Sequence, residues 1–377
     1  MGLLRLLLAL NVIIAHSPNG YIFKLTSIGG MLAVKVFFMI SGFYMSLILS
    51  KKYIGKGSYN LFITNRWLRL FPLYYAVAIL SIIIYFILYK TTGHGFSFEF
   101  WKDHISQLNP GSIIFIILTS ISVIGMDLTC FTTVNEVGKL IFTGDFYHST
   151  VPLFQFLFVP QAWTLSLEFL FYLIAPFIVK LKSRYIIAIG VISLLARLAV
   201  YHHGLNHEPW MYRFFPFEIL FFLSGILSYR FYEKISDFNI SDKILKSVLW
   251  GTILLIIIYQ YLPFIFRAHN FALFPFMFVV IPLLFKYTKN NKLDRYVGEL
   301  SFPVYICHLL VLNATSLFFS ADDPPKYFCV IVIILSVLLA MLLNKIIIAP
   351  IEKLRQNRST KKVKPDTEIF EPVVQNA

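Results

Sequence analysis

The stretch GGMLAVKVFFMISGFYMSLILS (29–50), followed directly by KKYIGKGSYNLFITNRWLR (51–69), determines how this chain must fold. The first part is an apolar run close to the ~20 residues with which an α-helix crosses a bilayer. The second part carries five Lys or Arg residues and no acidic residue. Because short basic loops stay in the cytoplasm, the pair predicts a spanning helix that ends on the cytoplasmic side.

The composition extends this prediction to the whole chain. Of the 377 residues, 58% are hydrophobic and 14% are charged, whereas a soluble domain carries about 25% charged residues. Lipid-exposed backbone must satisfy its hydrogen bonds within one segment, so the spans are expected to be helices. We predict an all-α polytopic integral membrane protein. Its net charge of +14 arises from basic loops that set topology and suit a lipid bilayer, so no nucleic acid is expected as a partner.

Positive charge also decides how many apolar segments cross. If segment 112–126 does not cross, all basic loops fall on one side; if it crosses, most of them fall outside. The segment is short, at about 15 residues, and rich in Ser and Thr. We predict ten crossings, with 112–126 re-entrant or interfacial and both termini cytoplasmic; eleven spans with an external tail are the alternative. The apolar segments lie at about 2–17, 30–50, 70–89, 112–126, 158–179, 185–201, 214–232, 247–265, 271–286, 302–319 and 327–348.

No second domain or repeat is visible. Residues 1–350 are predicted to form one transmembrane domain, and residues 351–377 a polar cytoplasmic tail without fixed structure. The opening run MGLLRLLLALNVIIAHSPNG (1–20) resembles a secretory signal. Its end matches the small-residue pattern of a cleavage site poorly, so we expect it to be the first crossing.

Two ionisable residues lie in this first run, where burying them is costly and therefore indicates function. Arg5 and His16 are eleven positions apart, which is three helical turns, so both lie on nearly one face about 16 Å apart. The alternative is that Arg5 extends to the inner membrane surface and His16 to the outer one. For His16 this alternative is weaker, because Pro18 would end the helix without a histidine.

A second pair of cations follows the basic loop. Arg66 and Arg69 are at positions i and i+3, so they share a helix face. Two guanidinium groups on one face can bind phosphates in bidentate fashion. Setting the topology and contacting lipid headgroups are the alternative roles.

An acid and a histidine lie in later spans. Glu168, in WTLSLEFLFYLIAP (163–176), is expected in the outer half of the membrane, where His16 is a suitable partner; the alternative is a water-filled vestibule. Tyr305 and His308 share a face, and His308 can handle a proton, contact a substrate or be a core residue. Lys35 is expected to extend to the outer surface. The motifs of nucleotide hydrolases and zinc enzymes are absent, so no metal is expected.

Together these features resemble the membrane acyltransferase-3 family, which includes O-acetyltransferases of bacterial surface polysaccharides. Its motifs occur in order from residue 5 to residue 308: Arg and His in the first span, FFxxSGF, RxxRxxP, a Trp–Ser–Glu–Phe–Tyr block and a weaker Ser–Pro–Tyr–His block. One departure is Lys35, which stands where the family has an acid, so no role of that acid is carried over. The matching residues are Arg5, His16, Phe37, Phe38, Ser41, Gly42, Phe43, Arg66, Arg69, Pro72, Trp163, Ser166, Glu168, Phe171, Tyr172, Ser301, Pro303, Tyr305 and His308.

The resemblance implies a stand-alone O-acyltransferase of the bacterial inner membrane. It would transfer an acyl group, expected to be acetyl, from cytoplasmic acetyl-CoA to a hydroxyl of an extracytoplasmic carbohydrate such as O-antigen, capsule or exopolysaccharide. A proton-coupled transporter or flippase is the alternative, because intramembrane His, Glu and Arg suit it equally. The oligomeric state is not readable.

The resemblance also assigns roles to residues. His16 would be the general base, oriented by Glu168, or would form an acyl-histidine intermediate. Tyr305 or His308 would assist the oxyanion. The expected acyl-CoA-binding residues are Arg5, Arg66 and Arg69, and the substrate-binding or supporting residues are Ser41, Trp163, Ser166, Tyr172, Tyr305 and His308.

Overall fold

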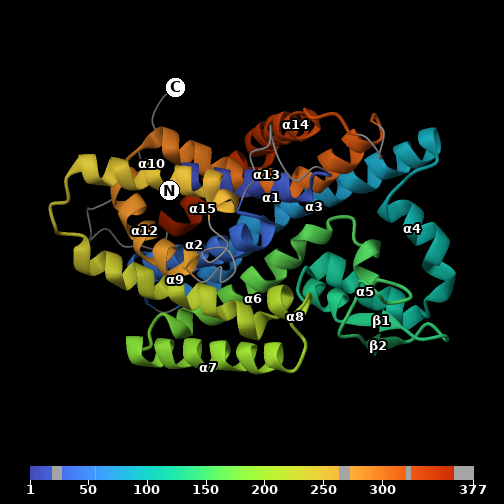
Figure 1. Cartoon of the computed structure of the whole chain (residues 1–377), viewed down its shortest axis with the longest axis horizontal. Coiled ribbons are helices and arrows are strands. Elements are labelled where there is room, and N and C mark those ends of the chain that lie inside the picture. The colour runs from blue at the N-terminus through green and yellow to red at the C-terminus, as the bar shows by residue number, and fades with distance from the viewer. Residues whose placement is uncertain (19–27, 56, 263–271, 320–323, 361–377) are drawn as a thin grey trace.

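The computed structural model describes residues 1–18, 28–55, 57–262, 272–319 and 324–360, and most of them are helical (Figure 1). Each apolar segment predicted from the sequence coincides with a helix, which confirms the all-α polytopic class. The helices and strands are α1 (Gly2–His16), α2 (Gly30–Lys51), α3 (Ser58–Thr92), α4 (Ser97–His104), α5 (Pro110–Ser122), β1 (Thr132–Val134), β2 (Leu140–Phe142), α6 (Trp163–Ile178), α7 (Ser183–His202), α8 (Trp210–Arg213), α9 (Phe215–Ile235), α10 (Asp242–Ile258), α12 (Leu273–Thr288), α13 (Lys292–Ser316), α14 (Phe328–Leu343) and α15 (Ala349–Thr360). Short turns of 3-10 or π-helix are η1 (Ile105–Gln107), η2 (Met126–Cys130), η3 (Leu153–Phe156), η4 (Pro160–Ala162), η5 (Tyr259–Tyr261) and η6 (Asn344–Ile348).

Seven helical stretches in the described part of the chain are long and apolar enough to cross a membrane. They contain α2, α3, α6, α7, α9, α13 and α14. Three further predicted crossings, α1, α10 and α12, are shorter helices of 15 to 17 residues. The count of ten crossings therefore stays a prediction, as does the side on which the termini lie.

Helices α1 and α13 pack along each other in the same direction. The Gly2 and Leu3 amides donate to the Asp294 carboxylate at the start of both helices, at 2.7 and 2.9 Å. At the other end, the His16 and His308 rings are 5.1 Å apart between centroids. Parallel spans must be separated by an odd number of crossings. Leaving α5 out gives seven predicted crossings between α1 and α13, whereas counting it gives eight.

The contacts of α5 agree with this topology. The helix begins at Pro110, where the Asn109 side chain caps the Ser112 amide at 2.8 Å. At its other end, the hydroxyls of Tyr74 and Tyr75 donate to the Ser120 and Ile121 carbonyls at 2.6 and 2.7 Å. Those tyrosines lie in the middle of α3, so α5 enters the bundle and stops partway. This supports the predicted re-entrant segment.

Helices α2 and α9 pack closely against each other. A methyl group placed on Gly42 would stand 2.0 Å from the Phe222 carbonyl oxygen, and one on Gly225 would stand 1.9 Å from that of Met39. Only glycine permits such an approach, so Gly42 and Gly225 allow the two helices to pack closely.

Lys35 is buried in this same pair of helices. Its Nζ donates to the Met211 carbonyl at 3.1 Å and lies 3.9 Å from Glu218 Oε1. Arg197 Nη1 approaches the same Glu218 oxygen at 3.3 Å. The prediction that Lys35 extends to the outer surface is wrong, because the buried Glu218 carboxylate supplies its counter-charge inside the protein.

Residues 93–157 form a separate region at one end of the bundle, around α4, α5 and a hairpin (Figure 1). Strands β1 and β2 pair antiparallel, with Thr133 opposite Ile141. The sequence did not predict this hairpin, whose strands are only three residues long. The region has a small apolar core of its own, formed by Leu108, Ile116, Val134, Val151, Leu153 and Phe156.

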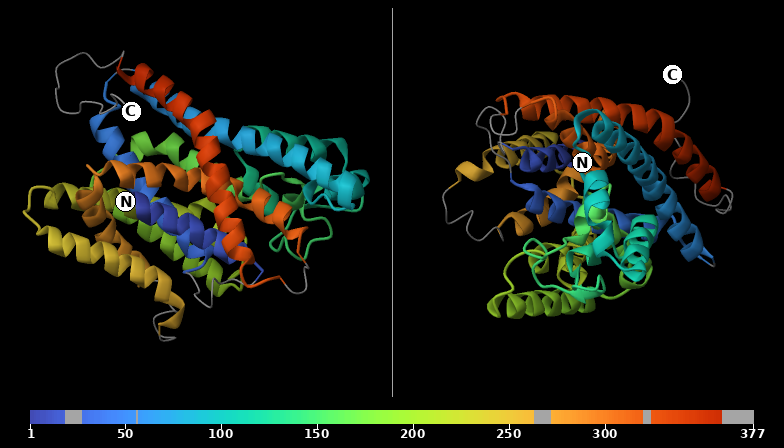
Figure 2. Two further views of the ribbon diagram at one scale, coloured as in Figure 1. Left: turned by 90° about the horizontal axis from the view of Figure 1, so that it is seen from above. Right: turned by 90° about the vertical axis from the view of Figure 1, so that its right-hand side faces the viewer.

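The chain remains helical beyond residue 351. After the π turn η6, helix α15 continues to Thr360 and packs on α3. Both views in Figure 2 show this last helix ending beside the start of α3. The predicted tail boundary therefore falls inside α15, and residues 361–377 lie outside the described part of the chain.

Candidate functional site

Five helices contribute the predicted site residues to one polar track. Helix α1 contributes Arg5 and His16 at its two ends, and α3 contributes Arg66 and Arg69. Ser41 comes from α2, Glu168 from α6 and His308 from α13. The track follows α1, so it begins with guanidinium groups and ends with imidazoles.

The predicted donor-side arginines come together at the Arg5 end. Arg5 interacts electrostatically with Arg69, and Tyr172 interacts with both Arg66 and Arg69. Arg66 is 5% exposed, and its guanidinium carbon lies 5.8 and 5.9 Å from the ring centroids of Phe62 and Tyr172. We call Arg5, Arg66 and Arg69 the arginine cluster.

In the described part of the chain, no carboxylate lies within ion-pair distance of the arginine cluster. Within the described residues, none of its three side chains makes a hydrogen bond or an ion pair, and Arg66 Nε is buried without an acceptor. A buried cation is costly unless it is paired and hydrogen-bonded. The arrangement is therefore suited to a ligand that brings several anionic oxygens, and phosphate groups satisfy this requirement.

Glu168 lies beside the arginine cluster. Ser41 Oγ donates to Glu168 Oε1 at 2.8 Å, and the Tyr172 hydroxyl donates to the same oxygen. Arg5 is within electrostatic range of this carboxylate. Glu168 is only partly buried, and within the described residues its second oxygen accepts no hydrogen bond.

The predicted pairing of Glu168 with His16 is not found. The described residues include no hydrogen bond or ion pair between them, and His16 interacts electrostatically with Arg213 and Glu208 instead. The reason is the depth of Glu168 in α6. Thr164 contacts Tyr305, which precedes His308, the neighbour of His16, on α13. Glu168 follows Thr164 by one more helical turn, about 6 Å, and so lies further from His16.

The orientation of His16 is set by its own helix. Its Nδ1 lies 2.8 Å from the Val12 carbonyl oxygen. Because a carbonyl can only accept a hydrogen bond, Nδ1 carries the hydrogen, and Nε2 of the neutral ring has a free lone pair. The residue is exposed at the end of α1. A general base requires such an accessible lone pair.

His308 repeats this arrangement in a buried position. Its Nδ1 lies 2.5 Å from the Tyr305 carbonyl, so its Nε2 also has the lone pair, and no partner for that atom is found in the described residues. The ring meets the His16 ring edge to face, at an interplanar angle of 61°. The structure therefore joins two imidazoles that the sequence left separate.

Tyr305 links α13 to α6 and η4 beside His308. Its hydroxyl contacts Thr164 Oγ1 at 2.9 Å and donates to the Gln161 carbonyl at 3.1 Å. Gln161 Nε2 in turn donates to the Ile306 carbonyl at 2.6 Å, which joins η4 to α13. Because these bonds occupy the Tyr305 hydroxyl, it has no spare hydrogen for an oxyanion.

The two remaining predicted residues, Ser166 and Trp163, contact the segments that flank α6. The Ser166 hydroxyl donates to Asp127 Oδ1 at 2.6 Å and accepts from the Gly125 amide at 3.0 Å, which fastens the turn after α5 to α6. Burial raises the pKa of Asp127, and the Ser166 hydrogen bond counteracts that rise. The guanidinium carbon of Arg213 lies over the Trp163 ring, 4.6 Å from its centroid.

Sequence reasoning missed several residues near His16. Arg213 Nε donates to Glu208 at 2.8 Å, and this pair is in electrostatic range of His16. Both residues precede the span at 214–232, where charged loop residues are common. A cation and an anion five positions apart are a weak signal, so only the tertiary structure reveals their position beside His16.

A family model described as an acyltransferase domain matches residues 1–345. The chain belongs to the acyltransferase-3 family. This confirms the resemblance, and the protein is an integral multi-pass membrane acyltransferase. No curated protein and no solved structure compared with the chain matches it.

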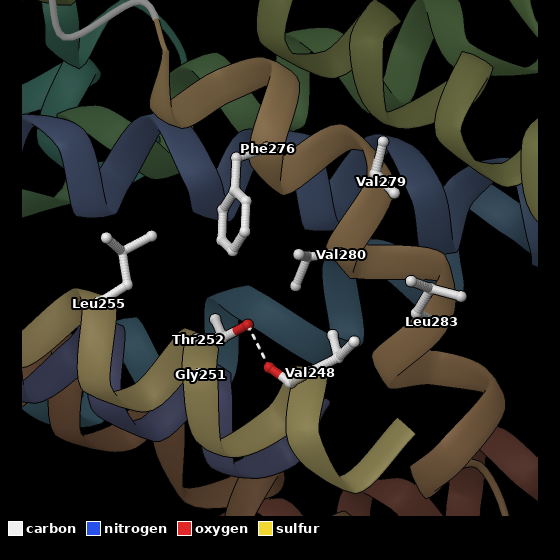
Figure 3. Close-up of a pocket in the computed structure, with 8 residues that line it drawn as sticks. All are labelled: Val248, Gly251, Thr252, Leu255, Phe276, Val279, Val280 and Leu283. Atoms are coloured by element: carbon white, nitrogen blue, oxygen red, sulfur yellow. Dashed lines mark hydrogen bonds between the residues drawn. The ribbon is translucent and has the colours of Figure 1, made fainter. Parts of the chain in front are cut away.

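An apolar groove in the acyltransferase lies between α10 and α12 (Figure 3). Its volume is about 410 Å³, and its walls are apolar. The Thr252 hydroxyl is its polar side chain, and it donates to the Val248 carbonyl at 2.7 Å. The groove therefore offers no group that could bind a charged coenzyme.

Proposed function

We propose that this acyltransferase transfers an acetyl group from acetyl-CoA to a hydroxyl of a bacterial surface carbohydrate, such as O-antigen, capsule or exopolysaccharide, at the inner membrane. One observation carries the proposal. Helix α1 has at one end the arginine cluster, which it shares with α3 and which forms no ion pair within the described residues, and at the other end a histidine with an available lone pair. These are the groups that a phosphate-rich acyl donor and a hydroxyl acceptor require.

The donor would bind at the arginine cluster, on the side that the basic loops predict to be cytoplasmic. Arg66 and Arg69 would hold its phosphates, with Arg5 behind them. The pantetheine arm would then extend along α1. Arg5 and His16 are about 16 Å apart along the helix, a span comparable to that arm. The second oxygen of Glu168 would accept an amide hydrogen of the arm, because Ser41 and Tyr172 both donate to the first oxygen.

The reaction would take place at His16. Its Nε2 accepts the proton of the acceptor hydroxyl while the hydroxyl oxygen attacks the thioester carbon. The carbon–sulfur bond then breaks, and the imidazolium returns the proton to the leaving CoA thiolate. Val12, instead of Glu168, orients the base in this scheme. Arg213 supplies positive charge near His16 during the reaction.

The test is transfer of radiolabel from acetyl-CoA to purified surface glycans in membranes that contain the protein. His16→Ala should reduce transfer by about 10²–10⁴-fold, because the general base is lost. His202→Ala is the matched control, since His202 is an exposed histidine at the end of α7. Undiminished transfer by His16→Ala, at normal protein levels, would refute the assignment.

The same assay separates an enzyme from a transporter. A transporter or flippase would move the glycan across the membrane without labelling it. Wild-type membranes that move but never label the glycan would overturn the proposed reaction.

A further inference from the structure

The C-terminal helix α15 adds a fourth arginine to the donor end of the track. Arg355 is 8% exposed and interacts electrostatically with Arg66 and Arg69. Its Nη1 forms an ion pair with Glu352, one helical turn earlier. The family match ends at residue 345, so nothing in that match assigns a role to this residue.

The position of Arg355 is imposed by the fold. The π turn η6 separates α14 from α15, and Pro350 follows it at the start of α15. Such π turns redirect a helix and are frequent at functional sites. Beyond the turn, α15 packs on α3, and Arg358 Nη2 donates to Thr64 Oγ1 at 3.2 Å. Thr64 is two residues before Arg66, so Arg355 is held next to the arginine cluster.

This grouping of cations is unfavourable by itself. Arg66 and Arg355 are both buried, and like charges in a low-dielectric setting repel each other. Glu352 offsets part of the charge of Arg355, but its side chain is 39% exposed. A polyanionic ligand would remove the repulsion.

We propose that Arg355 binds a phosphate group of the acyl donor, so that α15 completes the donor site. This inference rests on the proposed function, because it names a further residue of the same site. Glu352 forms an ion pair with Arg355 and would compete with the phosphate for its guanidinium.

The test is equilibrium binding of CoA to the full-length protein in detergent. Arg355→Ala should weaken binding about tenfold or more, since hydrogen bonds to charged groups contribute about 1.5–3 kcal/mol. Glu352→Gln should strengthen binding several-fold, because it removes the competing carboxylate. A gain in affinity cannot arise from a folding defect.

Lys353→Ala is the matched control. Lys353 is an exposed cation on the same helix, so its removal should leave the affinity unchanged. Dephospho-CoA, used as a second ligand, locates the contact. A loss confined to CoA assigns Arg355 to the 3′-phosphate, whereas a loss for both ligands assigns it to the pyrophosphate.

The outcomes distinguish this inference from the proposed function. If CoA binds and Arg66→Ala weakens it, but Arg355→Ala and Glu352→Gln change nothing, the inference about α15 is overturned alone. If the wild-type protein does not bind CoA, the proposed donor site fails and Arg355 fails with it.

Discussion

Two clusters of buried charge in this protein contrast sharply. In the Glu218 cluster, formed by Lys35, Arg197 and Glu218, both cations approach the same carboxylate oxygen at 3.9 and 3.3 Å and also donate to the Met211 carbonyl. The arginine cluster has no such contacts in the described part of the chain, although Arg66 is as well buried as Lys35.

The difference teaches which buried charges belong to a ligand site. Burial alone does not separate the two clusters, and neither does residue type. The presence of counter-charges and carbonyl acceptors does, because a satisfied charge supports the fold and an unsatisfied one can stabilise a bound anion. The contrast predicts that mutations in one cluster change stability and mutations in the other change donor affinity.

The largest effect is expected from Glu218→Gln. This change leaves Lys35 and Arg197 buried without their counter-charge, which costs about 3–5 kcal/mol of stability. Thermal unfolding in detergent measures it. The CoA affinity of the protein that remains folded should not change. An unaltered unfolding midpoint would show that the Glu218 cluster does not stabilise the fold.

Arg66→Ala should show the opposite pattern. CoA affinity is expected to fall by about 1.5–3 kcal/mol, or roughly 10- to 100-fold, because a charged hydrogen-bonding group is lost. Thermal stability should stay equal or rise, since an unpaired buried cation is removed. Strong destabilisation together with normal CoA binding would show that Arg66 supports the fold and does not bind the donor.

Tyr172→Phe should have a smaller effect on the donor side. It removes one of the two hydroxyls that donate to Glu168 Oε1 and keeps the ring beside Arg66. A loss of about 1 kcal/mol, or about fivefold, is expected in the KM for acyl-CoA. Ser41→Ala, which removes the other hydroxyl, is the natural comparison and should behave alike.

The smallest effect is expected from Arg69→Ala. Arg69 belongs to the arginine cluster but is exposed, so water and salt screen its charge. Its loss should weaken CoA binding by about 0.5–1 kcal/mol at low salt and less at high salt. A loss equal to that of Arg66→Ala at every salt concentration would show that burial is not what distinguishes the two arginines.

Much of the site was predictable because its signals are local. The spacing of Arg5 and His16 follows from helical geometry, and Arg66 with Arg69 follows from a one-turn repeat. Helices α1 and α13 run parallel, which requires that α5 does not cross the membrane. The number of crossings predicted from the basic loops alone agrees with this.

Contacts between helices were not predictable in the same way. Glu168 was expected to join His16, but its depth in α6 places it with Ser41 and Tyr172. Lys35 was expected to reach the surface, but it meets Glu218 more than 180 positions later. Neither outcome has a signal in spacing, because each depends on how two helices are aligned.

The sequence by itself determined the apolar segments, the basic loops and therefore a helical membrane protein, since the cost of burying charge and backbone in lipid acts on each segment alone. The tertiary structure decided which charges find partners. It paired the Lys35 and Arg197 cations with Glu218, placed His308 against His16, and carried Arg355 on α15 back to Arg66. The physical reason is that a counter-charge or a ring contact is set by helix packing, which segments distant in the chain establish together.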